Sequence, residues 1–82
     1  MKKITIYSTT TCPYCMMLKS WLDDKGISYT DHLVDRNPIA AQQMVNLSGQ
    51  MGVPFSTVEN EDGSIEKILG FDRNRFELAL AN

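Results

Sequence analysis

The sequence has only two cysteines and a single histidine, which leaves few ligands for a metal ion. A structural zinc site almost always needs four ligands, usually cysteine and histidine side chains. Small secreted domains that depend on cross-links carry about four to eight cysteines at wide spacings. Here Cys12 and Cys15 are separated by two residues, and His32 lies on a predicted strand away from them. We therefore expect no metal site and no framework of structural disulfides.

Long hydrophobic runs and an excess of charge are also missing. The longest apolar runs are about five residues, too short to span a bilayer. No hydrophobic segment with a cleavage site of small residues stands near the start of the chain. The net charge is -2, so no basic field attracts phosphates or an anionic membrane. We expect a soluble cytoplasmic protein with no nucleic acid and no membrane among its partners.

The composition that remains is that of a folded domain. The chain has 82 residues, of which 43% are hydrophobic and 22% are charged. Such a chain is too apolar to be intrinsically disordered. Its length provides material for one hydrophobic core. We expect residues 1–82 to form a single domain.

The first half of the chain predicts a strand–helix–strand unit. Apolar and polar residues alternate over Lys2–Ser8 and over Ile27–Val34, which predicts two strands. Between them Pro13 suits the first helical position and Gly26 suits a helix C-terminus, so we expect a helix over Pro13–Lys25. A helical crossover makes the two strands parallel.

The second half predicts a helix, a hairpin and a last helix. Asp62 and Gly63 are a strong turn signal between two strands, and Asp72 suits the N-cap of the last helix. These elements are expected over Ile39–Leu47, Val53–Val58, Ile65–Leu69 and Arg73–Ala81. The order βαβαββα predicts an α/β fold in which a four-stranded mixed sheet is flanked by three helices.

The apolar positions predict which side chains are buried. On the first helix Cys15, Leu18 and Leu22 share one face. The further candidates for the core are Met17 and Trp21 beside that face, Met44 in the second helix, and Phe76, Leu78 and Leu80 in the last helix.

The two cysteines have the arrangement that thiol–disulfide exchange requires. Cys12 stands at the start of a helix, where unpaired N–H groups and the helix dipole favour a negatively charged sulfur, so we expect it to be the nucleophile. Cys15, one turn further and turned inward, is expected to be the resolving thiol that displaces the mixed disulfide. Pro13 should tune the redox potential, and Tyr14 should offer contact surface beside the sulfurs.

Three short motifs resemble those of glutaredoxins. The segment Thr11–Cys15 is similar to the glutaredoxin active site, and Gly52–Pro54 and Gly70–Asp72 lie where that family has two further motifs. The resemblance extends over nearly the whole chain. It implies a thioredoxin-like fold of the glutaredoxin type.

The resemblance also implies roles for four further residues. In the family the proline matching Pro54 is cis, and the backbone of the residue matching Val53 pairs with an incoming extended peptide or glutathione. The residues matching Phe71 and Asp72 hold the amino end of the γ-glutamyl group of glutathione. We therefore expect these four residues to bind substrate, with no tightly bound cofactor and with glutathione as a co-substrate.

The implied activity is thiol–disulfide exchange, in which the protein reduces protein disulfides or glutathione-mixed disulfides through a reversible Cys12–Cys15 disulfide. Three positions depart from the family, since Thr9 replaces a lysine, Gly52 a threonine and Leu69 a glycine. These departures weaken the case for glutathione. The segments Ser48–Pro54 and Gly70–Arg73 resemble those of small bacterial glutaredoxin-like redoxins. Some of those relatives donate electrons to ribonucleotide reductase and are reduced by thioredoxin reductase. Glutathione and thioredoxin reductase are both candidate electron donors. We expect the protein to be a monomer.

One alternative of a different class is a binding module. Glutaredoxin-like proteins can hold a [2Fe–2S] cluster between two subunits, with the first cysteine of each and glutathione as ligands. Pro13 and the missing cation at Thr9 argue against this alternative.

Overall fold

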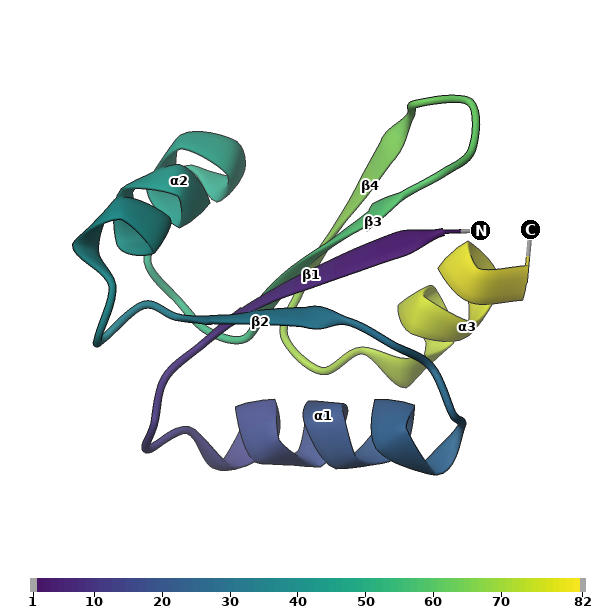
Figure 1. The fold of residues 1–82 in the computed structure, drawn as a ribbon, viewed down its shortest axis with the longest axis horizontal. Coiled ribbons are helices and arrows are strands. Elements are labelled where there is room, and N and C mark those ends of the chain that lie inside the picture. Colours follow the sequence, from purple (N-terminus) through teal and green to yellow (C-terminus); the bar gives the residue numbers. More distant parts are fainter. Residues whose placement is uncertain (1, 82) are drawn as a thin grey trace.

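The computed structural model describes residues 2–81, which form one mixed sheet with helices on both faces (Figure 1). The elements are β1 (Lys3–Ser8), α1 (Pro13–Asp24), β2 (Thr30–Leu33), α2 (Pro38–Ser48), β3 (Phe55–Glu59), β4 (Ile65–Leu69) and α3 (Arg73–Ala81). This order confirms the predicted βαβαββα arrangement of four strands and three helices.

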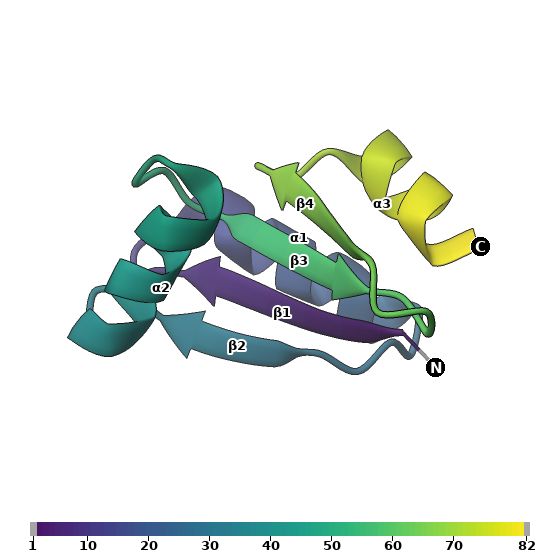
Figure 2. The same cartoon turned by 90° about the horizontal axis from the view of Figure 1, so that it is seen from above.

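The strands lie side by side in the order β2-β1-β3-β4, as the view from above shows (Figure 2). Strand β1 is parallel to β2, and β3 is antiparallel to both β1 and β4. The predicted parallel pair and the predicted hairpin are therefore both confirmed. Strands β1 and β4 end next to the start of β3. The loop after β1, the loop before β3 and the loop after β4 therefore lie at the same end of the sheet.

Helix α1 and strand β2 differ from the prediction at their shared connection. The helix ends at Asp24, and Lys25 is its C-cap. Strand β2 begins at Thr30, three residues later than the predicted Ile27. The N–H of Ile27 donates to the carbonyl of Leu22 at 3.0 Å, so this segment still closes the helix and does not pair with β1.

Helix α2 and strand β3 also have shifted starts. The helix begins at Pro38, one residue before the predicted Ile39, because the side chain of Asn37 caps it by accepting from the N–H of Ala40 at 3.2 Å. Strand β3 begins at Phe55, two residues after the predicted Val53. Pro54 has no N–H to donate to the sheet, which explains the later start.

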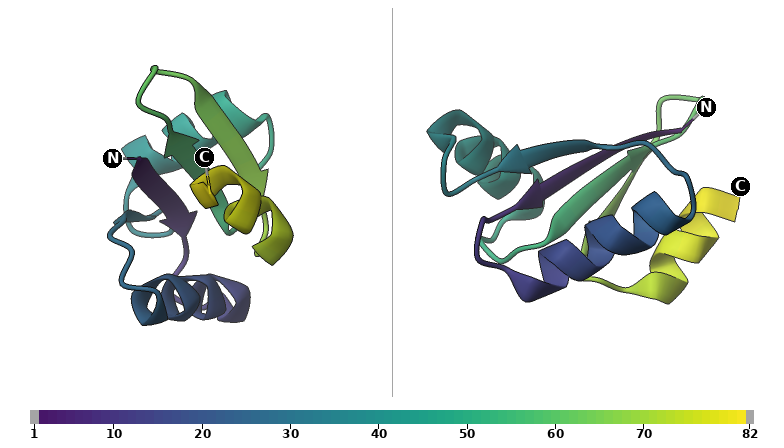
Figure 3. Two further views of the ribbon diagram at one scale, coloured as in Figure 1. Left: turned by 90° about the vertical axis from the view of Figure 1, so that its right-hand side faces the viewer. Right: turned by 60° about the horizontal axis from the view of Figure 1, so that its bottom comes forward.

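Two hydrophobic clusters fill the two faces of the sheet. The right-hand view of Figure 3 shows α1 and α3 on one side and α2 on the other. The larger cluster contains the buried residues Ile4, Ile6, Leu18, Leu22, Val58, Ile68, Phe76 and Ala79, and the smaller contains Tyr7, Ala40, Met44 and Phe55. Trp21 and Leu80 pack against the larger cluster in part.

Two predictions of burial were wrong. Met17 is 51% exposed and Leu78 is 70% exposed. Met17 stands two positions after buried Cys15, and Leu78 stands two positions after buried Phe76. A step of two residues turns a helical side chain to the opposite face.

No helix within residues 2–81 has both the length and the apolar character that crossing a membrane requires.

Candidate functional site

Cys12 lies at the start of α1, at the end of the loop that follows β1. Its backbone is extended, with φ -96° and ψ 110°, and Pro13 occupies the first helical turn. The N–H of Cys15 donates to the sulfur of Cys12 at 3.1 Å, so the side chain of Cys12 acts as the helix N-cap. The thiol is half-buried and free. A sulfur in this position is reachable from solvent and faces the positive end of the helix dipole.

Cys15 is the buried partner of this pair. It is 0% exposed and its thiol is also free. Burial, followed by the hydrogen bond to Cys12, raises the pKa of the Cys15 thiol from 9.0 to about 12. A backbone hydrogen bond from Thr9 and the positive charge of Lys19 act in the opposite direction. The two thiols therefore have different exposures one helical turn apart, the difference that the sequence predicted for an attacking and a resolving cysteine.

The loop before β3 approaches the same sulfur. The thiol of Cys12 lies 4.0 Å from the backbone carbonyl of Val53, which is within range of a weak S–H hydrogen bond. The Val53–Pro54 peptide bond is cis, as the resemblance implies, and Pro54 is buried. The backbone of Val53 is thus placed beside the exposed cysteine although the two residues are 41 positions apart.

The loop after β4 is joined to the Pro54 loop. The N–H of Gly70 donates to the carbonyl of Pro54 at 2.7 Å. Asp72 is exposed, and its carboxylate accepts from the N–H of Arg75 at 3.2 Å, which confirms the predicted N-cap of α3. The loop therefore places Phe71 and Asp72 on the side of the molecule where Val53 and Cys12 lie.

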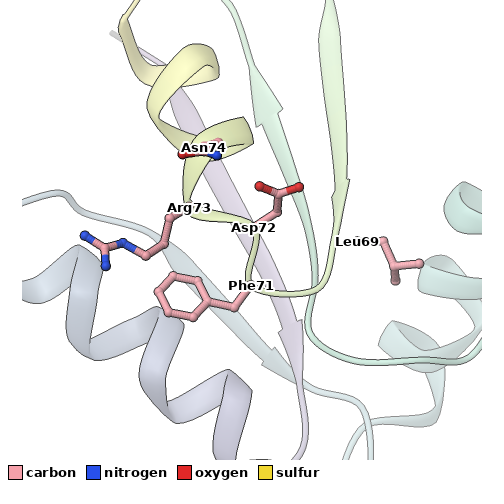
Figure 4. Close-up of a pocket in the computed structure, with 5 residues that line it drawn as sticks. All are labelled: Leu69, Phe71, Asp72, Arg73 and Asn74. Carbon is pink, nitrogen blue, oxygen red and sulfur yellow. The ribbon is translucent and has the colours of Figure 1, made fainter.

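A shallow pocket of about 480 Å³ follows this loop and is lined by Leu69, Phe71, Asp72, Arg73 and Asn74 (Figure 4). In the close-up Phe71 and Arg73 extend toward α1, whereas Asp72 and Leu69 point away from them. The ring of Phe71 meets the ring of Trp21 edge-on at 5.9 Å, and the guanidinium of Arg73 lies 5.9 Å from that ring. The loop is thereby packed against the helix that carries both cysteines.

Exposed apolar side chains occupy the first two turns of α1, next to the cysteines in the sequence. Tyr14 is 63% exposed, and Met16 and Met17 beside it are 61% and 51% exposed. Pro13 is exposed as well. These side chains are candidates for contact with a partner, because flexible methionine side chains adapt to apolar groups of varied shape.

A polar cluster on the side of the sheet covered by α1 was not predicted from the sequence. The ammonium of Lys19 lies 2.9 Å from one carboxylate oxygen of Asp31, and the hydroxyl of Ser8 donates to the other oxygen at 2.6 Å. Lys19 follows Cys15 by one helical turn. Asp31 comes from β2 and Ser8 from the end of β1, so no local pattern could have joined them. Only the basic character of Lys19 was visible in advance.

Among residues 2–81 no three histidine, cysteine or acidic side chains stand close enough together to hold a metal ion.

Comparison with known proteins agrees with the geometry. A family model described as glutaredoxin matches residues 4–61. An uncharacterized glutaredoxin-like 8.6 kDa protein in the rubredoxin operon of Clostridium pasteurianum is 43% identical over 70 residues, which are 85% of this chain and 87% of that protein. Glutaredoxin 3 of Escherichia coli strain K12 is 37% identical over 54 residues, which cover 66% of this chain and 65% of that protein.

Solved structures have the same fold. Methanoredoxin of Methanosarcina acetivorans matches 98% of this chain and 85% of its own, with a TM-score of 0.82 and 25% identity. A glutaredoxin of Archaeoglobus fulgidus matches 100% of this chain and 89% of its own, with a TM-score of 0.82 and 17% identity. These matches show the thioredoxin-like fold of the glutaredoxin type.

Proposed function

Because the chain belongs to the glutaredoxin family of thiol–disulfide oxidoreductases, we propose that it reduces protein disulfides or glutathione-mixed disulfides through a reversible Cys12–Cys15 disulfide. The observation that carries this proposal is the contrast between the two thiols. Cys12 is half-exposed at the start of α1, and Cys15 is fully buried with its N–H 3.1 Å from the sulfur of Cys12. An accessible nucleophile and a protected resolver are the two groups that disulfide exchange needs.

The proposed reaction has two exchange steps. The thiolate of Cys12 attacks one sulfur of the substrate disulfide, forms a mixed disulfide and releases the other sulfur as a thiolate that takes up a proton. The sulfur of Cys15 then attacks the sulfur of Cys12 and releases the second substrate thiol. The substrate is reduced by two electrons, and the two cysteines of the protein are oxidised to a disulfide.

The proposed binding residues come from the start of α1, the loop before β3 and the loop after β4. The backbone of Val53, whose carbonyl lies 4.0 Å from the thiol, is the proposed partner of the backbone of an extended peptide or glutathione. Pro54 fixes the conformation of this loop, and Gly70 joins the Phe71–Asp72 segment to it. Phe71 and Asp72 are the proposed contacts for the γ-glutamyl end of glutathione. Pro13 and Tyr14 are the proposed contacts for a protein substrate.

The electron donor for the oxidised protein is glutathione or thioredoxin reductase in this proposal. The neutral Thr9 replaces the lysine with which many members of the family bind glutathione. We therefore assign a proposed role to protein disulfides, including that of ribonucleotide reductase, beside the role of glutathione. The proposed setting is a monomer in the cytoplasm.

Substitution of the two cysteines tests the exchange mechanism. Cys12→Ser is expected to abolish reduction of a disulfide substrate, because the attacking thiolate is lost. Cys15→Ser is the matched control, since it keeps the first step and should accumulate a mixed disulfide on Cys12 that mass spectrometry detects. Undiminished reduction by the Cys12→Ser protein would contradict the proposal.

The electron donor is tested by two coupled assays run side by side. One contains glutathione with glutathione reductase, and the other contains thioredoxin reductase, each with NADPH oxidation as the signal. The faster assay identifies the donor, and absence of turnover in both would contradict the proposed activity. Visible absorbance of an anaerobically reconstituted sample would favour the [2Fe–2S] alternative instead.

A further inference from the structure

The ion pair between Lys19 and Asp31 lies partly buried beneath the active-site helix. Each of the two side chains is 22% exposed, so the pair is shielded from solvent more than a typical surface ion pair. Asp31 is held on its other oxygen by the hydroxyl of Ser8 at 2.6 Å, and Ser8 is 0% exposed. The carboxylate therefore has a fixed partner on each oxygen. The ammonium of Lys19 is tied to the sheet by the 2.9 Å contact.

The tied ammonium lies on the face of α1 that carries Cys15. Lys19 follows Cys15 by four residues, a spacing that places two side chains next to each other on one helix face. Cys15 and Ser8 are both fully buried, and Asp31 bridges from Ser8 to Lys19. The cluster thus extends from the interior of the sheet to the side chain beside the resolving sulfur.

The charged and titratable groups around this sulfur are few. Cys12, the N-cap of α1, and Lys19 within α1 act on it directly. Cys12 disfavours its charged form, whereas the charge of Lys19 favours that form, in addition to the stronger effect of the backbone hydrogen bond at Thr9. Asp31 of β2 stands behind Lys19. Beyond it Tyr29 has its pKa raised by burial, by a hydrogen bond with Asp23 and by the charges of Asp23 and Asp31.

We propose that Lys19, anchored by Asp31 and Ser8, is a positioning residue that favours the thiolate of Cys15 and thereby sets the rate of the resolving step. This inference rests on the proposed function, because the resolving step exists only in that reaction. A buried thiol reacts slowly, since the surrounding apolar groups disfavour its thiolate. A fixed cation beside the sulfur opposes that effect at the moment when the thiolate must form.

The step is balanced in sulfur, protons and electrons. The Cys15 thiol loses its proton as its sulfur bonds to the sulfur of Cys12, and the bond between Cys12 and the substrate sulfur breaks. The departing thiolate takes up a proton and leaves as a thiol. Lys19 stays protonated throughout and exchanges neither proton nor electron.

The test measures Cys15 alone, in a protein that cannot turn over. In a Cys12→Ser background, the rate of alkylation of Cys15 by iodoacetamide is recorded over the neutral to mildly alkaline range. Adding Lys19→Gln is expected to lower that rate about threefold to tenfold, the change that half a unit to one unit of pKa produces. Lys19→Arg should restore most of the rate, because it keeps the positive charge.

The matched control is Lys25→Gln, which removes a lysine from the end of the same helix. The ammonium of Lys25 lies 4.9 Å from the centre of the Trp21 ring, away from the anchored pair. Its removal is expected to leave the alkylation profile of Cys15 unchanged. An equal slowing in the Lys19→Gln and Lys25→Gln proteins, or none in the Lys19→Gln protein, would overturn the assignment.

The anchoring part of the proposal is tested by a double-mutant cycle. The effect of Lys19→Gln is measured again in a background that also contains Asp31→Asn. If Asp31 holds the ammonium in place, the same substitution has a smaller effect there. An effect of equal size in both backgrounds would overturn the role of Asp31.

The result of the alkylation experiment can be distinguished from the result of the activity assays that test the proposed function. The alkylation experiment needs no substrate, reductase or redox turnover. A wild-type protein that reduces no disulfide would contradict the proposed function. It would not change the measured effect of Lys19 on the alkylation of Cys15. Conversely, full activity with no effect of Lys19 on Cys15 would contradict only this inference.

Discussion

At the scale of the residue, burial distinguishes two chemically identical side chains. Cys12 and Cys15 belong to one helical turn, but Cys15 is 0% exposed and Cys12 is half-buried. Desolvation disfavours the thiolate of the buried residue, and the raised pKa of Cys15 reflects this. Each cysteine is thereby suited to a different step of the proposed exchange reaction.

The pKa of Cys15 predicts an alkaline limit to the stability of the reduced protein. The thiol titrates near 9.0 when exposed and at about 12 in the fold, so the unfolded chain loses its proton first as the pH rises. The stabilising effect is complete below 9.0 and is lost as the pH approaches 12. Urea unfolding under reducing conditions measures this decline. The Cys15→Ala protein should show a weaker decline, and identical pH dependence in both proteins would contradict the prediction.

Two buried serines on β strands predict opposite effects of the same substitution. The hydroxyl of Ser56 has no hydrogen-bond partner among the described residues, although Ser56 is 0% exposed. Ser56→Ala removes an unsatisfied polar group, so stability should stay the same or rise by up to about 1 kcal/mol. Ser8→Ala is the matched control, because it removes the 2.6 Å bond to Asp31 and should cost roughly 1.5 to 3 kcal/mol. Equal losses in urea unfolding would refute this interpretation.

At the scale of the element, the starts of the helices determine which groups are available. In α1 the N-cap is Cys12, so the group that caps the helix is also the proposed nucleophile. In α2 the N-cap is Asn37, a residue with no redox chemistry. The same capping geometry therefore holds the proposed nucleophile in one helix and a residue that only stabilises the helix in the other.

The cap of α2 gives a prediction for stability. Asn37→Ala removes the oxygen that accepts from the N–H of Ala40 at 3.2 Å and should lower the free energy of unfolding by about 1 kcal/mol. Asn46→Ala, an exposed position inside the same helix, is the control and should cause no comparable loss. Chemical denaturation of both variants provides the measurement. A larger loss at Asn46 than at Asn37 would show that the cap is unimportant.

At the scale of the whole molecule, the sheet topology assembles the site. Strands β1 and β4 end where the antiparallel strand β3 begins, so the loops of Cys12, Pro54 and Gly70 lie together at one end of the sheet. The N–H of Gly70 binds the carbonyl of Pro54 at 2.7 Å and thereby couples two of these loops. Substrate binding should therefore depend on residues that never touch a sulfur.

A pair of glycine substitutions tests this dependence. Gly70 has φ +78° and Gly63, in the β3–β4 turn, has φ +89°, so Ala at either position should cost about 1 kcal/mol of stability. Only Gly70→Ala should also raise KM for a disulfide substrate, because it displaces the Phe71–Asp72 segment from the Pro54 loop. Steady-state kinetics of both variants measure the difference. A similar rise of KM in Gly63→Ala would indicate a general loss of structure.

Local patterns in the sequence were sufficient for most of the fold. The strand alternation, the Asp62–Gly63 turn and Pro13 at a helix start all act over a few residues, and the structure has each of them in its expected element. The errors lie where a neighbouring contact competes. Ile27 was expected in a strand but binds Leu22 of the preceding helix, and Met17 was expected inside but lies on the outer face.

The sequence by itself determined the cysteine pair and the helix start on which the proposed chemistry depends, because these residues are close neighbours in the chain. Only the tertiary structure decided what surrounds that pair. Val53 is 41 residues from Cys12, and Asp31 is 12 residues from Lys19 and 23 from Ser8. Contacts over such separations depend on strand order and register, which no local periodicity specifies. The two thiols were therefore predictable as a pair, and the anchored cation beside the buried one was not.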